Sequence, residues 1–240
     1  MNILKEYISN RIGSVNIRVR IIQEIINSIK AKTYLEIGVQ NGSTFLRIRA
    51  PKKIAIDPSI KISMKAKSFF LIYNPKNLFN HYFEITSDDF FLNYKEVLSE
   101  NKIDVAFIDG LHTFEQSLKD ILNCLEYLNE KGIIVMHDCS PRSETIGSAV
   151  MSREEAFNPD WSGDVWKTIA YLRNNRNDLN VFVLNCDYGL GIITRGKPEY
   201  LLDYSPEELK NLNYEDFQKD RVKILNLKKP SYFLEFIKTL

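Results

Sequence analysis

The chain has 240 residues, of which 44% are apolar and 26% are charged, a balance typical of one globular domain with a small extension. Its 32 basic and 31 acidic side chains leave a net charge of +1, so we expect no nucleic-acid partner, because a phosphate backbone is bound by an excess of positive charge. An odd number of cysteines without a C-x-x-C pair, a charged N-terminus and the lack of any apolar run of about 18 residues predict a cytoplasmic protein with no disulfide framework and no membrane span.

Residues 1–31 are expected to form a helical extension, because isoleucines recur on one face at helical spacing. Five short strands are then predicted at intervals, over Tyr34–Val39, Lys53–Ile56, His81–Ile85, Ile103–Ile108 and Ile133–Met136. Before the fifth strand, an apolar stripe predicts a helix over Phe114–Leu128 that stops at Gly132. Strands alternating with helices indicate a largely parallel sheet that is covered on both faces.

The pattern changes after the fifth strand. Residues 139–163 contain prolines and glycines without periodicity and are expected to be irregular. A helix over 164–173 and two strands, Val181–Leu184 and Gly189–Thr194, should follow, and their short connection predicts a hairpin with one antiparallel strand. The predicted class is therefore α/β, a Rossmann-like, doubly wound and mostly parallel sheet with an antiparallel C-terminal hairpin strand. It should occupy residues 32–198, followed by a helical tail over 199–240.

A nucleoside site is predicted at the end of the first strand. An apolar run reaches Glu36 and then breaks into a turn that holds Gly38 and Gly42, and Asp57 closes the second strand after an intervening helix. Glycines let the backbone approach a ligand, and an acid at this place accepts hydrogen bonds from ribose hydroxyls. The glycine spacing does not fit the dinucleotide fingerprint G-x-G-x-x-G. An ordinary strand-to-helix turn is the structural alternative.

Acidic residues also follow the later strands. Ser87 and Asp88 come after the third strand, where they serve as ligand contacts, as helix caps, or as both. Asp109 ends the fourth strand and Asp138 the fifth, and the ends of parallel neighbours meet at one edge of a sheet. Two converging carboxylates repel each other unless a proton or a cation intervenes, and Mg²⁺ is normally held by one or two carboxylates.

Three segments carry a resemblance to a known family. The pattern E-x-G-x-x-x-G from Glu36 resembles the first motif of class I S-adenosylmethionine-dependent methyltransferases. The patterns D-G-x-H from Asp109 and H-D-C from His137 resemble the metal-dependent small-molecule and sugar O-methyltransferases, a branch that includes macrolide-sugar methylating enzymes. The resemblance covers residues 33–194 and implies methyl transfer to a hydroxyl of a small-molecule or sugar acceptor, with S-adenosyl-L-methionine and magnesium as cofactors.

The resemblance also implies roles for single residues. Those expected to bind the methyl donor are Glu36, Gly38, Gly42, Ser43, Asp57, Ser87, Asp88 and Asp109. The expected metal ligands are Asp109, His137 and Asp138, although His137 departs from the pattern and imidazole is a poor ligand for magnesium. His112, with Asp109, makes up the expected catalytic pair, in which His112 is the general base. A structural hydrogen bond is the alternative for His112.

Several points stay open at this stage. Trp161 and Trp166 form either a wall for a sugar ring or anchors to the core, and Asp164 either faces the acceptor or caps the helix that follows it. His81 is expected to be structural. A nicotinamide-dependent Rossmann reductase or epimerase and an inactive binding subunit are the rival functions, and the terminal helices allow a homo-oligomer.

Overall fold

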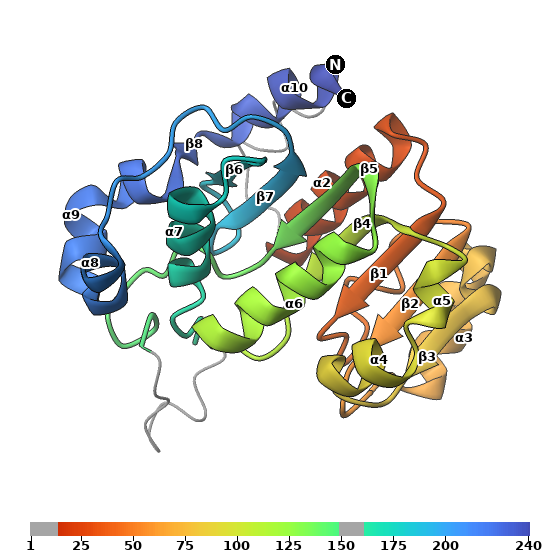
Figure 1. The fold of residues 1–240 in the computed structure, drawn as a ribbon. Coiled ribbons are helices and arrows are strands. Elements are labelled where there is room, and N and C mark those ends of the chain that lie inside the picture. The colour runs from red at the N-terminus through yellow and green to blue at the C-terminus, as the bar shows by residue number, and fades with distance from the viewer. Residues whose placement is uncertain (1–13, 149–160) are drawn as a thin grey trace.

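The computed structural model describes residues 14–148 and 161–240. An eight-stranded sheet runs through it in the order β3-β2-β1-β4-β5-β7-β6-β8 (Figure 1). The five strands from β3 to β5 are parallel, β7 is antiparallel to both of its neighbours, and β8 is parallel to β6. The predicted fold class is confirmed. The strands are β1 (Thr33–Ile37), β2 (Lys52–Ile56), β3 (Asn80–Phe83), β4 (Ile103–Ile108), β5 (Leu128–Met136), β6 (Leu179–Leu184), β7 (Leu190–Arg195) and β8 (Leu227–Lys228).

Helices cover both faces of the sheet because neighbouring residues of each strand point to opposite faces and both sets are apolar. In β1, Tyr34 packs toward α2 and Leu35 toward α6 and α7. The first face is covered by α2 (Ser14–Ser28), α3 (Met64–Tyr73) and α10 (Phe233–Phe236). The second face is covered by α4 (Ser87–Asn93), α5 (Glu96–Ser99), α6 (Phe114–Glu126), α7 (Trp166–Asn175) and α9 (Tyr214–Leu225). The remaining short elements are η1 (Pro75–Phe79), α8 (Pro206–Asn211), η3 (Pro230–Tyr232) and η4 (Ile237–Thr239).

The expectation of a helix between the first two strands is wrong, because residues 43–47 form only turns. Long-range side chains take the carbonyl groups that a helix would use. The Lys53 ammonium donates to the carbonyl of Phe45 at 2.7 Å, and the Asn74 amide donates to the carbonyl of Ile48 at 2.8 Å. The first connection is therefore held by the residues that follow it in sequence.

Two further expectations are corrected. Gly132 does not stop a helix: α6 ends at Glu126, and β5 begins at Leu128, which already pairs with Ile103. The tail is not helical throughout, because β8 adds a strand beside β6. Among the described helices, none combines the length and the apolar character needed to cross a bilayer.

Candidate functional site

A cleft of about 850 Å³ opens beyond the carboxyl ends of β1, β2, β4 and β5. Its lining includes Arg18 from α2 and Tyr188 from the β6–β7 turn as well as residues that follow the parallel strands. The cleft therefore lies at the edge where an open parallel sheet binds its ligands.

Gly38 shapes the floor of the cleft. Its φ is +87°, and a Cβ atom there would lie 1.9 Å from the carbonyl oxygen of Asp109. Only glycine lets the turn after β1 pass this close to the end of β4. The same turn brings the backbone N–H of Gln40 to 2.8 Å from the Asp57 carboxylate, which also accepts from the N–H of Ser59 at 2.7 Å. Asp57 lines the cleft and keeps lone pairs for a ligand.

Other residues of the predicted first motif lie away from the cleft lining. Gly42 and Ser43 follow the turn without lining the cleft. Glu36 is buried beneath it and accepts a hydrogen bond from the hydroxyl of Tyr34. Burial raises the pKa of Glu36 to about 8, and burial lowers the pKa of the nearby Lys53 to about 7.

Ser87 and Asp88 line the cleft from the first turn of α4, whose N-cap is Thr86 rather than either of them. The Gln116 amide donates to both, at 3.2 Å to Ser87 and 3.1 Å to Asp88. It also donates to Asp120 at 3.0 Å, a buried carboxyl that lines the cleft and whose pKa burial raises to about 6.

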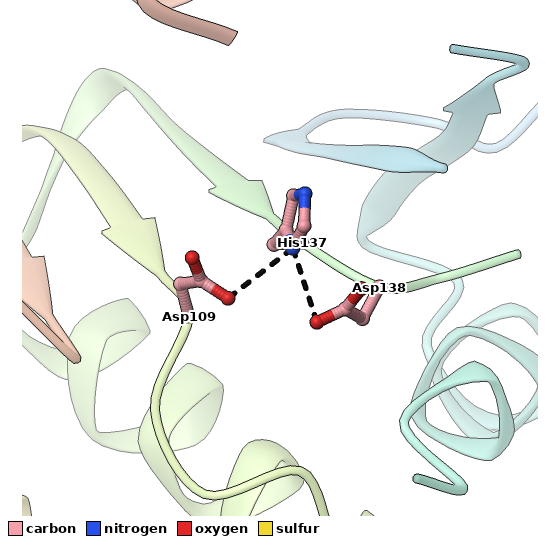
Figure 2. Close-up of side chains that lie close together, drawn as sticks. All are labelled: Asp109, His137 and Asp138. Atoms are coloured by element: carbon pink, nitrogen blue, oxygen red, sulfur yellow. Dashed lines mark ion pairs between the residues drawn. The ribbon is translucent and has the colours of Figure 1, made fainter. Parts of the chain in front are cut away.

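Two carboxylates and an imidazole meet at the ends of β4 and β5. Figure 2 shows Asp109 and Asp138 on either side of His137, whose Nδ1 lies 3.2 Å from Asp109 and 3.0 Å from Asp138. Burial lowers the pKa of His137, but the two carboxylates outweigh it and raise that pKa well above its usual value. No described group forms a hydrogen bond of good geometry with either ring nitrogen of His137.

The arrangement of Asp109, His137 and Asp138 has the geometry of a site for a divalent cation. Their ligand atoms all lie within 4.8 Å of one another. In an octahedral site with ligand bonds near 2.1 Å, adjacent ligand atoms are about 3 Å apart, close to both separations from Nδ1 of His137. Two carboxylates and one imidazole also suit metals that accept mixed oxygen and nitrogen ligands, such as Mn²⁺.

Arg18 reaches this cluster from α2. Its guanidinium donates to Asp187 through Nε at 2.6 Å and Nη2 at 3.0 Å, and to Asp109 through Nη1 at 3.2 Å. The Asp187 side chain is fully buried, and its second cation is His137, with Nε2 at 3.5 Å. Burial raises the pKa of Asp187, but the close contact with His137 and the hydrogen bonds from Arg18 lower it overall.

His112 faces the same carboxylates from the other side. Its Nε2 lies 3.5 Å from Asp109 and 3.3 Å from Asp138, while Nδ1 lies 2.8 Å from the carbonyl oxygen of Trp161. Burial lowers the pKa of His112, but the bond to Asp109 and the charges of Asp138 and Asp109 raise it to about 9. At neutral pH, His112 therefore carries a proton unless the charge of these carboxylates is neutralised.

The segment after residue 160 closes onto His112. Gly163 has φ +58°, and a Cβ atom there would lie 1.6 Å from the carbonyl oxygen of His112. Trp161 lines the cleft beside the His112 ring, with centroids 5.6 Å apart, whereas Trp166 is buried against Phe217. Thus Trp166 is an anchor and Trp161 is part of the cleft wall.

Of the two alternatives for Asp164, the cap of the following helix is wrong, and Asp164 does not line the cleft. Its carboxylate accepts from the N–H of Phe114 at 2.7 Å, at the start of α6, and the N-cap of α7 is Val165. The contact ties the loop before α7 to the helix after His112. His81 lies exposed in β3, outside the cleft lining.

Sequence reasoning missed Arg18, Gln116, Asp120, Asp187 and Tyr188. For Arg18 a signal was present, because a charged residue lies four and seven positions before Ile22 and Ile25, on the buried face of α2. Asp187 and Tyr188 both have positive φ, +48° and +58°, within the predicted hairpin turn. No local pattern connects that turn to Arg18, 169 positions away.

Comparisons with known proteins show what the chain is similar to. Residues 35–139 match a family model described as a methyltransferase domain. A candidate caffeoyl-CoA O-methyltransferase from Staphylococcus aureus is 18% identical with a TM-score of 0.54, covering 81% of this chain and 91% of its own. The S-adenosylhomocysteine-bound methyltransferase PaMTH1 from Podospora anserina has the same identity and TM-score, covering 80% and 86%.

A third similar structure is the O-methyltransferase TomG from Streptomyces achromogenes, involved in tomaymycin synthesis and solved with S-adenosylmethionine. It is 15% identical with a TM-score of 0.51, covering 73% of this chain and 78% of its own. No curated protein matches the sequence.

Proposed function

We propose that the chain is a class I, S-adenosylmethionine-dependent methyltransferase and that it methylates a hydroxyl group of a small molecule or sugar, which the matching methyltransferase domain model and the shared fold support. The observation that carries this proposal is the convergence of His112 with Asp109 and Asp138 at one end of a cleft whose other end holds Asp57. A base and two carboxylates beside a nucleoside half-site are what hydroxyl methylation needs, because an alkyl hydroxyl is a weak nucleophile.

We place the methyl donor in the half of the cleft between β1 and α4. Asp57 would accept from the ribose hydroxyls, Asp88 would contact the adenine amino group, and Gly38 lets the backbone approach the donor. When bound, S-adenosylmethionine supplies a methyl group on a positively charged sulfur. PaMTH1 and TomG, whose structures hold the product and the donor, share this fold and support the assignment.

The acceptor would lie between the donor and His112, against Trp161. The contact of Nδ1 with the Trp161 carbonyl oxygen fixes the ring, so Nε2 is the nitrogen that would take the hydroxyl proton. A divalent cation on Asp109, His137 and Asp138, magnesium by resemblance, would lower the pKa of the acceptor hydroxyl. Positive charge there also offsets the two carboxylates that keep His112 protonated.

The general base can be tested with a matched pair of histidines. Purified protein is incubated with S-adenosylmethionine and a panel of catechols and sugars, and S-adenosylhomocysteine and methylated product are measured by mass spectrometry. We expect His112→Gln to lower kcat by about 100-fold or more with the best acceptor, while His81→Gln, on the exposed part of β3, leaves it unchanged. Unchanged turnover in His112→Gln would exclude His112 as the general base.

The metal is tested by binding rather than by turnover. Mn²⁺ titration followed by electron paramagnetic resonance should give a site that Asp138→Asn weakens and that Asp203→Asn, an exposed acid outside the cleft, does not. Equal Mn²⁺ binding by all three proteins, or none by the wild type, would contradict the proposed metal site.

A further inference from the structure

One surface of the molecule exposes an unusual amount of apolar side chain. The helix α3 buries none of its ten residues, and η1 buries none of its five. Ile72 is 78% exposed and Phe79 66%. We call this the α3–η1 surface; its exposed large apolar side chains are Met64, Phe69, Leu71, Ile72, Tyr73, Leu78 and Phe79.

The same surface is strongly basic. Residues 47–79 contain eight lysines and arginines but only one acid, Asp57, which is buried. The rest of the chain holds 24 basic and 30 acidic residues, so the positive charge is concentrated here. Five of these basic side chains are exposed: Arg47, Arg49, Lys61, Lys65 and Lys76.

The α3–η1 surface lies at one end of the sheet. Figure 1 shows α3 and η1, in orange and tan, at the edge beside β3, away from α8 and α9. Ala66 and Phe70 pack toward the core, and the Arg47 guanidinium lies over the Phe70 ring at 4.9 Å, which leaves the other apolar side chains facing outward. The loop that leads into α3 lines the cleft through Pro58, Ser59 and Lys61.

We propose that the α3–η1 surface docks the protein on an anionic lipid surface. Interfacial helices bury apolar and aromatic side chains at the boundary between headgroups and acyl chains, and lysines and arginines around them attract anionic headgroups. Exposed aliphatic side chains such as Ile72 and Leu78 gain nothing from a nucleic acid, which is bound through phosphate contacts and base stacking. A symmetric dimer would place this basic surface against its own copy, where like charges repel. The inference does not depend on the proposed methyl transfer.

The test is flotation of the full chain with lipid vesicles. We expect binding to vesicles of equal parts phosphatidylglycerol and phosphatidylcholine, weaker binding as salt is raised, and at least about tenfold less binding to phosphatidylcholine alone. Replacing two exposed apolar residues together, Ile72→Ser with Phe79→Ser, should reduce binding to anionic vesicles by about tenfold or more. The double variant Lys65→Glu with Lys76→Glu should do the same. Val222→Ser, at a side chain 67% exposed on α9, is the matched control and should bind as the wild type does.

Four outcomes would overturn the proposal. They are no binding to anionic vesicles, equal binding to both vesicle types, equal loss in the Val222 control, or binding to anionic vesicles that the α3–η1 variants leave intact. Sedimentation velocity and titration with a fluorescent single-stranded oligonucleotide identify the alternatives. A wild-type dimer that Ile72→Ser dissociates, without vesicle binding, would assign the surface to a second copy, and oligonucleotide binding without vesicle binding would assign it to a nucleic acid. Because the substituted side chains are exposed, circular dichroism should show unchanged folding.

Discussion

Arg18 is expected to stabilise the whole site, and Arg18→Met removes its charge while keeping most of its aliphatic length. Asp187 is fully buried and receives two hydrogen bonds from Arg18, at 2.6 and 3.0 Å. Removing one partner of a buried pair typically costs 3–5 kcal/mol because the other charge is left uncompensated. His137 still faces Asp187 at 3.5 Å, so we expect the lower end, about 3 kcal/mol.

Urea unfolding of the wild type and Arg18→Met measures this cost, and a surface pair supplies the control. Arg176 also makes two hydrogen bonds to one carboxylate, both 2.7 Å long, but that carboxylate, Asp178, is half exposed. Arg176→Met should therefore cost less than about 1 kcal/mol. In addition, the double variant with Asp187→Asn should recover part of the loss of Arg18→Met. A cost for Arg18→Met no larger than that for Arg176→Met would refute the reasoning.

Three further predictions follow from single positions. Gly38→Ala should abolish S-adenosylhomocysteine binding in calorimetry or prevent folding, because its Cβ atom would lie 1.9 Å from the Asp109 carbonyl oxygen; normal affinity would contradict this. Gly163→Ala should lower kcat by displacing the loop from His112 and should leave donor affinity near the wild-type value, since Gly163 does not line the cleft. Glu36→Gln should stabilise the protein most near pH 8. The pKa of Glu36 is about 8 when folded, so wild-type stability falls as pH rises from about 4.5 to 8, by roughly 4 kcal/mol, and the variant should lose this slope in urea unfolding from pH 5 to 8.

The sheet was predictable because its pattern is local. Each parallel strand is an apolar run with both faces buried, and the hairpin connection was short enough to require an antiparallel strand, as β7 confirms. The acids at the strand ends were predictable for the same reason. Asp57 and Asp109 directly follow their strands, Asp138 comes two positions after β5 ends, and a parallel sheet gathers such positions at one edge.

What failed depends on contacts between distant segments. Residues 43–47 look helical in sequence, but the buried Lys53 ammonium takes the carbonyl of Phe45. Arg18 and Asp187 belong to opposite ends of the chain, and only the folded packing of α2 against the β6–β7 turn brings them together. Asp164 precedes α7 in sequence, but tertiary packing brings its carboxylate to the first N–H group of α6, that of Phe114.

The central claim, that the cleft binds S-adenosylmethionine through Asp57, is tested most directly by calorimetric titration with S-adenosylhomocysteine. We expect the wild type and Asp203→Asn to bind alike and Asp57→Asn to bind about 10- to 100-fold more weakly, because the ribose hydroxyls lose a charged acceptor worth about 1.5–3 kcal/mol. Absence of binding by the wild type, or equal affinity in Asp57→Asn, would contradict the claim.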